Sequence, residues 1–134
     1  MKLWQKSTEV NKAVDRFTVG RDRELDLYLA EADVLGSLAH TRMLESIGLM
    51  SMEDLEKVQR GLKEIYREIQ EGRFTIDEGI EDVHSQVEFM LTERVGEAGK
   101  KIHSGRSRND QVLVDWKICL RKQVYEGAAL EEQL

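Results

Sequence analysis

The chain contains no proline among its 134 residues, and its apolar residues recur at intervals of three and four. Proline breaks a helix because it lacks the backbone N–H and its ring clashes with the preceding turn, so long helices can run here without interruption. The ten glycines are then the main residues that can end a helix. The clearest apolar stripe consists of Leu55, Val58, Leu62, Ile65 and Ile69. This combination predicts an all-α fold.

Four helices are predicted from the same periodicity, over residues 22–47, 52–70, 80–95 and 110–134. A glycine closely follows each of the first three helices, and the link between the first two is short. These two helices are therefore expected to form an antiparallel hairpin. The segment between the third and fourth helices is expected to be a loop that contains glycine.

Finer signals mark the ends and faces of these helices. Ser51 is an expected N-cap, with Asp54 three residues later as in a capping box. Gly36 and Ser37 are expected to permit the close approach of a neighbouring helix. The apolar stripe that predicts the first helix consists of Leu25, Tyr28, Leu29, Ala32, Leu35, Ala39, Met43 and Ile47. Within the first twenty residues, Val10, Val14 and Phe17 have helical spacing, which is compatible with a short helix there.

The net charge and the cysteine content limit the class of protein. The formal net charge is −6 at pH 7, which disfavours nucleic acid as a partner. Cys119 is the only cysteine, so the chain cannot form an internal disulfide, and a reducing cytoplasm is the expected location. No apolar run approaches the roughly 18 residues of a membrane span, so no membrane partner is expected.

The stretch over residues 100–111 carries the most chemistry. It holds two arginines, two serines, a histidine and an asparagine, and it ends where a long helical pattern begins. Guanidinium groups, hydroxyls and the free N–H groups of a helix start favour an anion, either carboxylate or phosphate. The alternative interpretation of these residue types is a solvated basic turn that caps a helix.

Residues 103–111 read His-Ser-Gly-Arg-Ser-Arg-Asn-Asp-Gln. This block resembles the His-Thr-Gly-Arg-Ser-Arg-Asn-Asp-Gln block of the argininosuccinate lyase family, with Ser104 where threonine is usual. Residues 81–84, 33–40 and 2–4 also resemble segments of that family, in the same order. Fumarases and adenylosuccinate lyases share the fold but carry different residues in the matching loop. The chain is therefore identified as similar to the N-terminal portion of an argininosuccinate lyase.

The resemblance implies a division of the chain and an assembly. Residues 1–111 would form the N-terminal helical domain with a substrate-binding loop. Residues 112–134 would form the first part of the central helical-bundle domain, and the chain is expected to be an N-terminal fragment because the helical pattern runs to its last residue. The intact protein would be a homotetramer.

The resemblance also implies a reaction, the reversible β-elimination of argininosuccinate to L-arginine and fumarate in arginine biosynthesis, without metal or organic cofactor. The residues implied to bind substrate are Ser107, Arg108, Asn109, Asp82 and His84. The catalytic acid and base lie in later blocks of the family, so no catalytic residue is expected in this chain, and the chain alone is expected to be inactive.

Some features depart from the family or permit other interpretations. Residues 5–8 differ from the family's Gly-Gly-Arg-Phe, and the family's substrate-binding serine after Phe17 has no assignable counterpart. Glu81 and His84 have the Glu-x-x-His spacing of di-iron bundles, although only one copy is present. An ion pair between His84 and Glu88 on one helix face is the structural alternative. For the whole protein, the alternatives are a non-catalytic crystallin-like protein or a helical interaction protein.

Overall fold

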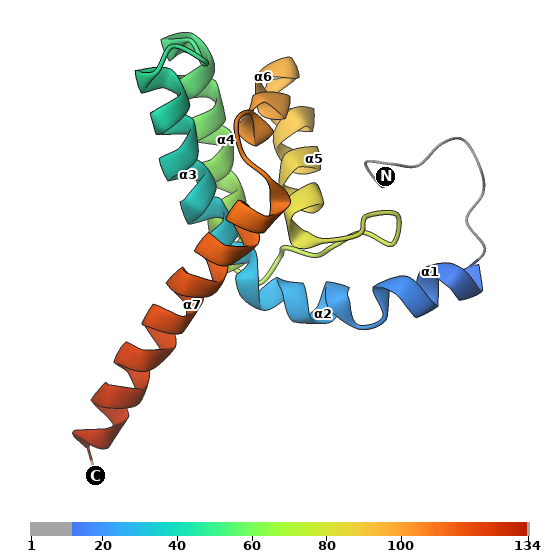
Figure 1. Ribbon diagram of the computed structural model, residues 1–134, viewed down its shortest axis with the longest axis vertical. Helices are drawn as coiled ribbons and strands as arrows, with labels where there is room; N and C mark the ends of the chain where they lie inside the picture. The colour runs from blue at the N-terminus through green and yellow to red at the C-terminus, as the bar shows by residue number, and fades with distance from the viewer. Residues whose placement is uncertain (1–11, 134) are drawn as a thin grey trace.

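The computed structural model describes residues 12–133, and every regular element in that range is helical (Figure 1). The elements in chain order are α1 (Lys12–Val19), α2 (Asp22–Asp26), the 3-10 turn η1 (Leu27–Leu29), α3 (Ala30–Ser46), α4 (Met52–Gln70), α5 (Val83–Val95), α6 (Glu97–Lys100), the 3-10 turn η2 (Lys101–His103) and α7 (Arg108–Glu131). The predicted all-α fold is confirmed. Predictions that concern residues 1–11 or Leu134 lie outside the described residues. Within residues 12–133, no helix has both the length and the apolar character needed to cross a membrane.

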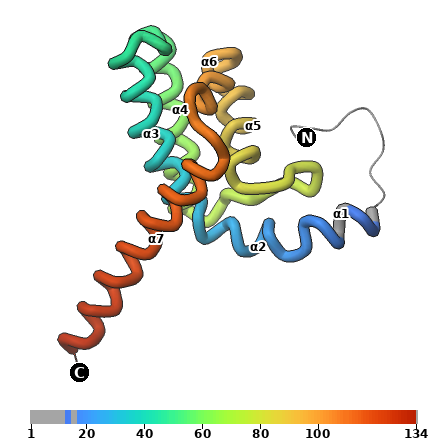
Figure 2. The backbone as a smooth tube through the Cα atoms, viewed as in Figure 1, coloured from blue at the N-terminus to red at the C-terminus, as the bar shows by residue number. Residues whose placement is uncertain are grey.

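The predicted antiparallel hairpin is formed by α3 and α4, and α5 packs against α4 (Figures 1 and 2). The expected N-cap is present, because the Ser51 hydroxyl accepts a hydrogen bond from the Asp54 backbone N–H at 3.1 Å. Gly48 ends the preceding segment with a φ of 78°, a conformation that glycine adopts without strain. The largest fully buried apolar side chains are Leu44, Leu62, Ile65, Leu91, Ile102, Val34, Val58, Val83 and Val87. The core therefore lies between the hairpin, α5 and the segment that follows α5.

The buried face of α3 coincides only in part with the apolar stripe that predicts the helix. Leu35, Met43 and Ile47 of that stripe are exposed, whereas Thr41 and Asp33 are fully buried. Val34 and Leu44 of α3 pack into the core, whereas the other buried residues of the helix are small or polar, and α7 approaches the helix closely. A Cβ atom added to Gly36 would lie 3.3 Å from a methyl group of Val114. The expected close approach at Gly36 is confirmed, and the neighbouring helix is α7.

Helix starts differ from the predicted ones where side chains cap the backbone. Residues 80–82 were predicted to be helical, but α5 begins at Val83 because Asp82 is extended and its carboxylate accepts the Ser85 N–H. The predicted helix over 22–47 is interrupted by η1, whose tighter i→i+3 hydrogen bonds separate α2 from α3. Residues 97–103, expected to be loop, form α6 and η2.

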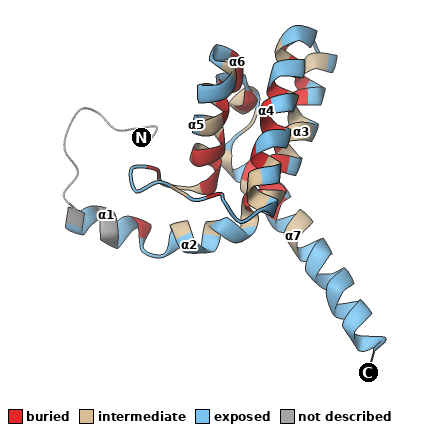
Figure 3. Cartoon of the chain, turned by 180° about the vertical axis from the view of Figure 1, so that it is seen from behind, coloured by how far each residue is buried: buried red, intermediate tan, exposed pale blue. Residues whose placement is uncertain are grey.

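The last helix begins two residues earlier than predicted. The Ser107 hydroxyl accepts the Asp110 N–H, and the Asp110 carboxylate accepts the Ser107 N–H, which together form a capping box. The first turns of α7 pack on α3, whereas every described residue after Cys119 is exposed (Figure 3). The helix therefore projects from the helical body (Figure 1). Several apolar side chains of its projecting part, among them Leu120 and Val124, are exposed to solvent.

Candidate functional site

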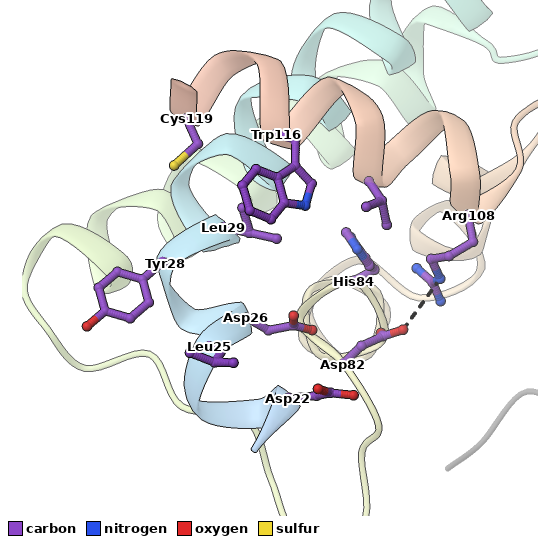
Figure 4. A pocket seen from close by; sticks show the side chains of 11 residues that line it. Asp22, Leu25, Asp26, Tyr28, Leu29, Asp82, His84, Arg108, Trp116 and Cys119 are labelled. Atoms are coloured by element: carbon purple, nitrogen blue, oxygen red, sulfur yellow. Dashed lines mark ion pairs between the residues drawn. The ribbon is translucent and has the colours of Figure 1, made fainter. Parts of the chain in front are cut away.

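A pocket of about 530 Å³ lies where α2 and η1 face the start of α5 and the first half of α7 (Figure 4). The apolar residues that line it include Leu25, Leu29, Val112 and Trp116. The charged and titratable residues that line it are Asp22, Asp26, Asp82, His84 and Arg108, besides the phenol of Tyr28 and the thiol of Cys119. The pocket thus combines an apolar wall with several carboxylates and one guanidinium group.

Two helix starts bring the charged groups of this pocket together. Asp82 is the N-cap of α5, and Arg108 is the first residue of α7. The Nε atom of Arg108 lies 3.5 Å from the Oδ2 atom of Asp82 (Figure 4). The same guanidinium donates to the Ser85 hydroxyl at 3.3 Å and to the Gln111 side-chain oxygen at 3.2 Å. The caps determine where each helix begins, and the packing of α5 and α7 against α3 brings the two helix starts together.

Asp26 lines the pocket beside the start of α5. Its Oδ2 atom accepts a hydrogen bond from the Val83 backbone N–H at 3.2 Å. Burial raises the pKa of Asp26 above its ordinary value, although the hydrogen bond from Val83 opposes that effect.

His84 is buried, with 3% of its surface exposed, and its ring reaches the pocket from α5. Its Nδ1 atom lies 2.8 Å from the Oδ1 atom of Asp33 on α3 and 3.5 Å from the Oδ2 atom of Asp115 on α7. The predicted ion pair with Glu88 is therefore wrong. The Glu-x-x-His interpretation is also wrong, because Glu81 precedes α5 and does not share a helix face with His84.

Three of the five predicted substrate-binding residues line this one pocket, namely Asp82, His84 and Arg108. Ser107 and Asn109 do not line it, and both are exposed. Ser107 is engaged in the capping box, where its hydroxyl also lies 3.2 Å from the Asp110 carboxylate. Within the described part of the chain, the Asn109 side chain makes no hydrogen bond.

A buried polar cluster behind the pocket was not predicted. Asp33, Gln111 and Asp115 are each less than 5% exposed, and Gln111 donates to the Oδ1 atom of Asp33 at 2.6 Å. Arg106 reaches the same region and donates to the Ser37 hydroxyl at 2.9 Å. The available sequence signal was a pair of aspartates within helical patterns, a residue type rarely buried without a partner. That signal is weak because the same aspartates on a solvent-facing side would be ordinary.

Charge is concentrated in this cluster. Burial and the negative charge of Asp33 raise the pKa of Asp115 to about 8. Burial lowers the pKa of Arg106, while attraction to Asp33 and Asp115 opposes that effect. The cluster therefore contains a carboxyl group that favours its neutral form at neutral pH.

Asp33, His84 and Asp115 also offer a possible set of metal ligands, because their ligand atoms all lie within 4.8 Å of one another. Two carboxylates and an imidazole suit several divalent ions. The nearby Arg106 guanidinium opposes a dication, since it already supplies positive charge to both carboxylates. The charge balance favours a proton over a metal ion at this position.

The fold and the pocket define an all-α chain with a mixed-charge site at the starts of two helices. The family whose sequence model matches residues 5–133 is described as Lyase, and the chain belongs to this family. It is 64% identical over 133 residues to proteins named argininosuccinate lyase from Bacteroides thetaiotaomicron and Bacteroides fragilis. It is 45% identical over 130 residues to the protein of that name from Geobacter metallireducens. These matches cover 99%, 99% and 96% of this chain, but the chain spans only about 30% of the length of the curated relatives.

Proposed function

We propose that the full-length protein containing this chain is an argininosuccinate lyase, which converts argininosuccinate reversibly to L-arginine and fumarate. The observation that carries this proposal is the 64% identity, over 99% of the chain, to proteins of that name. The pocket supports it, because a guanidinium group and several carboxylates suit a substrate that bears both carboxylates and cationic nitrogen groups. By the same resemblance, the whole protein is a cytoplasmic homotetramer of arginine biosynthesis that needs neither metal nor organic cofactor.

The reaction requires a base that removes a proton from the carbon beside a substrate carboxylate. The carbanion that forms places additional negative charge on that carboxylate, and an acid then protonates the departing guanidino nitrogen. Donors directed at the charged carboxylate stabilise this intermediate, and each can contribute about 3 kcal/mol. We assign this donor role to Ser107, Arg108 and Asn109, and we assign the binding of other substrate groups to Asp82 and His84.

The geometry refines these assignments. Nδ1 of His84 lies 2.8 Å from Oδ1 of Asp33, so a neutral His84 ring that donates to this carboxylate would present an acceptor at Nε2 to the substrate. Arg108 already contacts Asp82 in this chain, so substrate would exchange that contact for one with its own carboxylate. Ser107 and Asn109 lie outside the pocket of this chain and would bind substrate only if another part of the protein completes the site there.

The proposal is tested by incubating the full-length protein with argininosuccinate and following fumarate by its ultraviolet absorbance. Steady production of fumarate and arginine is expected. Adenylosuccinate serves as the matched control, because it is the substrate of a different enzyme of the same superfamily. A folded protein that converts neither substrate would favour the non-catalytic, crystallin-like alternative. The 134-residue chain assayed alone is expected to release no fumarate, because the acid and base blocks are expected beyond residue 134.

A further inference from the structure

Three titratable side chains from three helices meet in the interior behind the pocket. Asp33 comes from α3, His84 from α5 and Asp115 from α7, and their exposed fractions are 0%, 3% and 1%. Only His84 reaches the pocket itself. The two aspartates therefore have no direct route to a substrate and act, if at all, through His84.

The hydrogen bonds around Asp33 determine which of these groups carry protons. Its Oδ1 atom lies 2.6 Å from Nε2 of Gln111, which can only donate, and 2.8 Å from Nδ1 of His84. Oδ1 is therefore an acceptor of two hydrogen bonds, as expected for a carboxylate. Nδ1 of His84 must then carry a proton, and in the neutral ring Nε2 is left unprotonated.

The remaining oxygens of the two aspartates lack donors. Within residues 12–133, Oδ2 of Asp33 and both carboxyl oxygens of Asp115 are buried without a hydrogen-bond partner. A buried acceptor without a donor is destabilising. Two ionised carboxylates would also repel each other here, because a carboxylate oxygen of Asp33 lies within 4.8 Å of one of Asp115. One proton on Asp115 would convert an orphaned acceptor into a donor for Asp33 and would remove the repulsion.

We propose that Asp33 and Asp115 share one proton and form a positioning pair that holds His84 in the Nδ1–H form, with Nε2 presented to the pocket. Neither aspartate touches the substrate. The pair restrains the imidazole ring and specifies its tautomer, much as second-layer carboxylates orient ligating histidines. The role in catalysis rests on the proposed lyase function, whereas the shared proton does not.

The groups that face Asp115 are Asp33 from α3, His84 from α5, Asp26 from α2 and Arg106 from the segment before α7. Burial and the charge of Asp33 raise the pKa of Asp115 to about 8, and attraction to Arg106 opposes that effect. An ionised Asp115 paired with Arg106 is the rival arrangement. At neutral pH the Asp115 carboxyl group is protonated in the proposed arrangement and ionised in the rival one.

Infrared difference spectroscopy of the full-length protein at neutral pH separates these arrangements without reference to activity. A protonated carboxyl group has a C=O stretching band distinct from that of a carboxylate. We expect this band in the wild-type spectrum and its loss in Asp115→Asn. If the wild type lacks the band, Asp115 is ionised and the proposal is overturned. It is equally overturned if zinc or manganese raises the melting temperature of the wild type but not of Asp115→Asn, because the pair would then bind a metal ion.

Kinetics of the full-length protein test the positioning role. In Asp115→Asn the amide group still donates to Asp33, so we expect kcat/KM to fall by less than about threefold. Asp115→Ala removes the donor, so we expect kcat/KM to fall at least about tenfold. A double-mutant cycle with His84 provides the second test. Asp33→Asn should lower kcat/KM about tenfold in the wild-type background. In the His84→Gln background it should lower kcat/KM hardly any further.

Equal losses from Asp33→Asn in both backgrounds would mean that Asp33 does not act through His84, and the positioning role would be overturned. Equal losses in Asp115→Asn and Asp115→Ala, with unchanged melting temperatures, would overturn the donor role of Asp115. If the wild type does not convert argininosuccinate, the proposed function fails, while the infrared band still decides whether the proton is shared.

Discussion

The guanidinium group of Arg108 faces the carboxylate of Asp82, with 3.5 Å between Nε and Oδ2, although Asp82 caps α5 and Arg108 begins α7. Both side chains are partly exposed, so the ion pair itself contributes about 1 kcal/mol or less to stability. The arrangement therefore does more to define the pocket than to hold the helices together.

Replacing Arg108 by lysine is expected to lower kcat/KM of the full-length protein about a hundredfold while hardly changing its melting temperature. A lysine ammonium retains the charge but cannot make the planar, two-point contact that a guanidinium makes with a carboxylate. The matched control is Arg121→Lys, which changes an exposed arginine on the same helix. Steady-state kinetics and thermal unfolding of both variants check this expectation, and near-normal activity of Arg108→Lys would refute a specific carboxylate contact.

Ser107→Ala is expected to lower stability, whereas Asn109→Ala is expected to lower activity with little change in stability. Ser107 caps α7, so its replacement should lower the free energy of unfolding by about 1 kcal/mol. Asn109 is exposed and is not the cap, so its replacement should change that free energy by less than about 0.5 kcal/mol. If Asn109 holds the substrate, kcat/KM of the full-length enzyme should fall by a hundredfold or more, about 3 kcal/mol. Denaturant unfolding and kinetics of both variants are the measurements, and full activity of Asn109→Ala would remove it from the site.

The pH dependence of stability should reveal the ionisation of Asp115. Its pKa is raised from 3.8 to about 8, so between these values the folded state holds a proton that the unfolded state has released. The contribution of this group to stability is therefore complete below pH 3.8 and is lost as the pH rises to about 8. Asp115→Asn cannot ionise and should lack this dependence.

We expect the stability of Asp115→Asn relative to the wild type to increase as the pH rises toward 8 and to remain constant above it. Urea unfolding of both proteins across this range measures the difference. Parallel pH profiles for the two proteins would show that Asp115 is ionised throughout, in agreement with the rival pairing to Arg106.

The projecting part of α7 is expected to make the 134-residue chain self-associate. Leu120 and Val124 are 53% and 69% exposed, and exposed apolar stripes on a helix tend to pair with another copy. Replacing both residues by glutamate should shift the chain toward monomer in light scattering. Ala129→Glu, which adds negative charge at an exposed position on the opposite side of the same helix, should not. A monodisperse wild-type monomer at high concentration would contradict the expectation.

The helices were predicted well where the signals that start and end them lie within a few residues of the helix ends. The helix over residues 52–70 is confirmed at both ends, because an N-cap serine, a regular apolar stripe and a following glycine all operate on the same segment. The start of α5 was predicted too early, because the apolar residue Ile80 continued the helical spacing although Asp82 caps the helix after it. Ile80 is nevertheless buried, so its apolar side chain packs in the interior although the residue lies outside the helix.

The candidate site was predictable in part. Asp82, His84 and Arg108 could be named from the sequence because they lie in contiguous blocks that resemble one family. Their meeting in one pocket could not, because it depends on two capped helix starts that are brought together only when α5 and α7 both pack against α3. The placement of Ser107 and Asn109 outside that pocket also depends on the direction in which α7 begins.

The sequence by itself determined that the chain is helical, where most helices end, and which family it belongs to, since these depend on local spacing and contiguous residues. Only the tertiary structure decided which face of α3 is buried and that Asp33 meets His84 and Gln111, which follow it by 51 and 78 residues. The physical reason is that helical periodicity records where apolar side chains lie around one helix, not which distant segment covers them. A buried aspartate becomes stable only when folding brings its donors to it, so its role emerges with the packing of α3, α5 and α7.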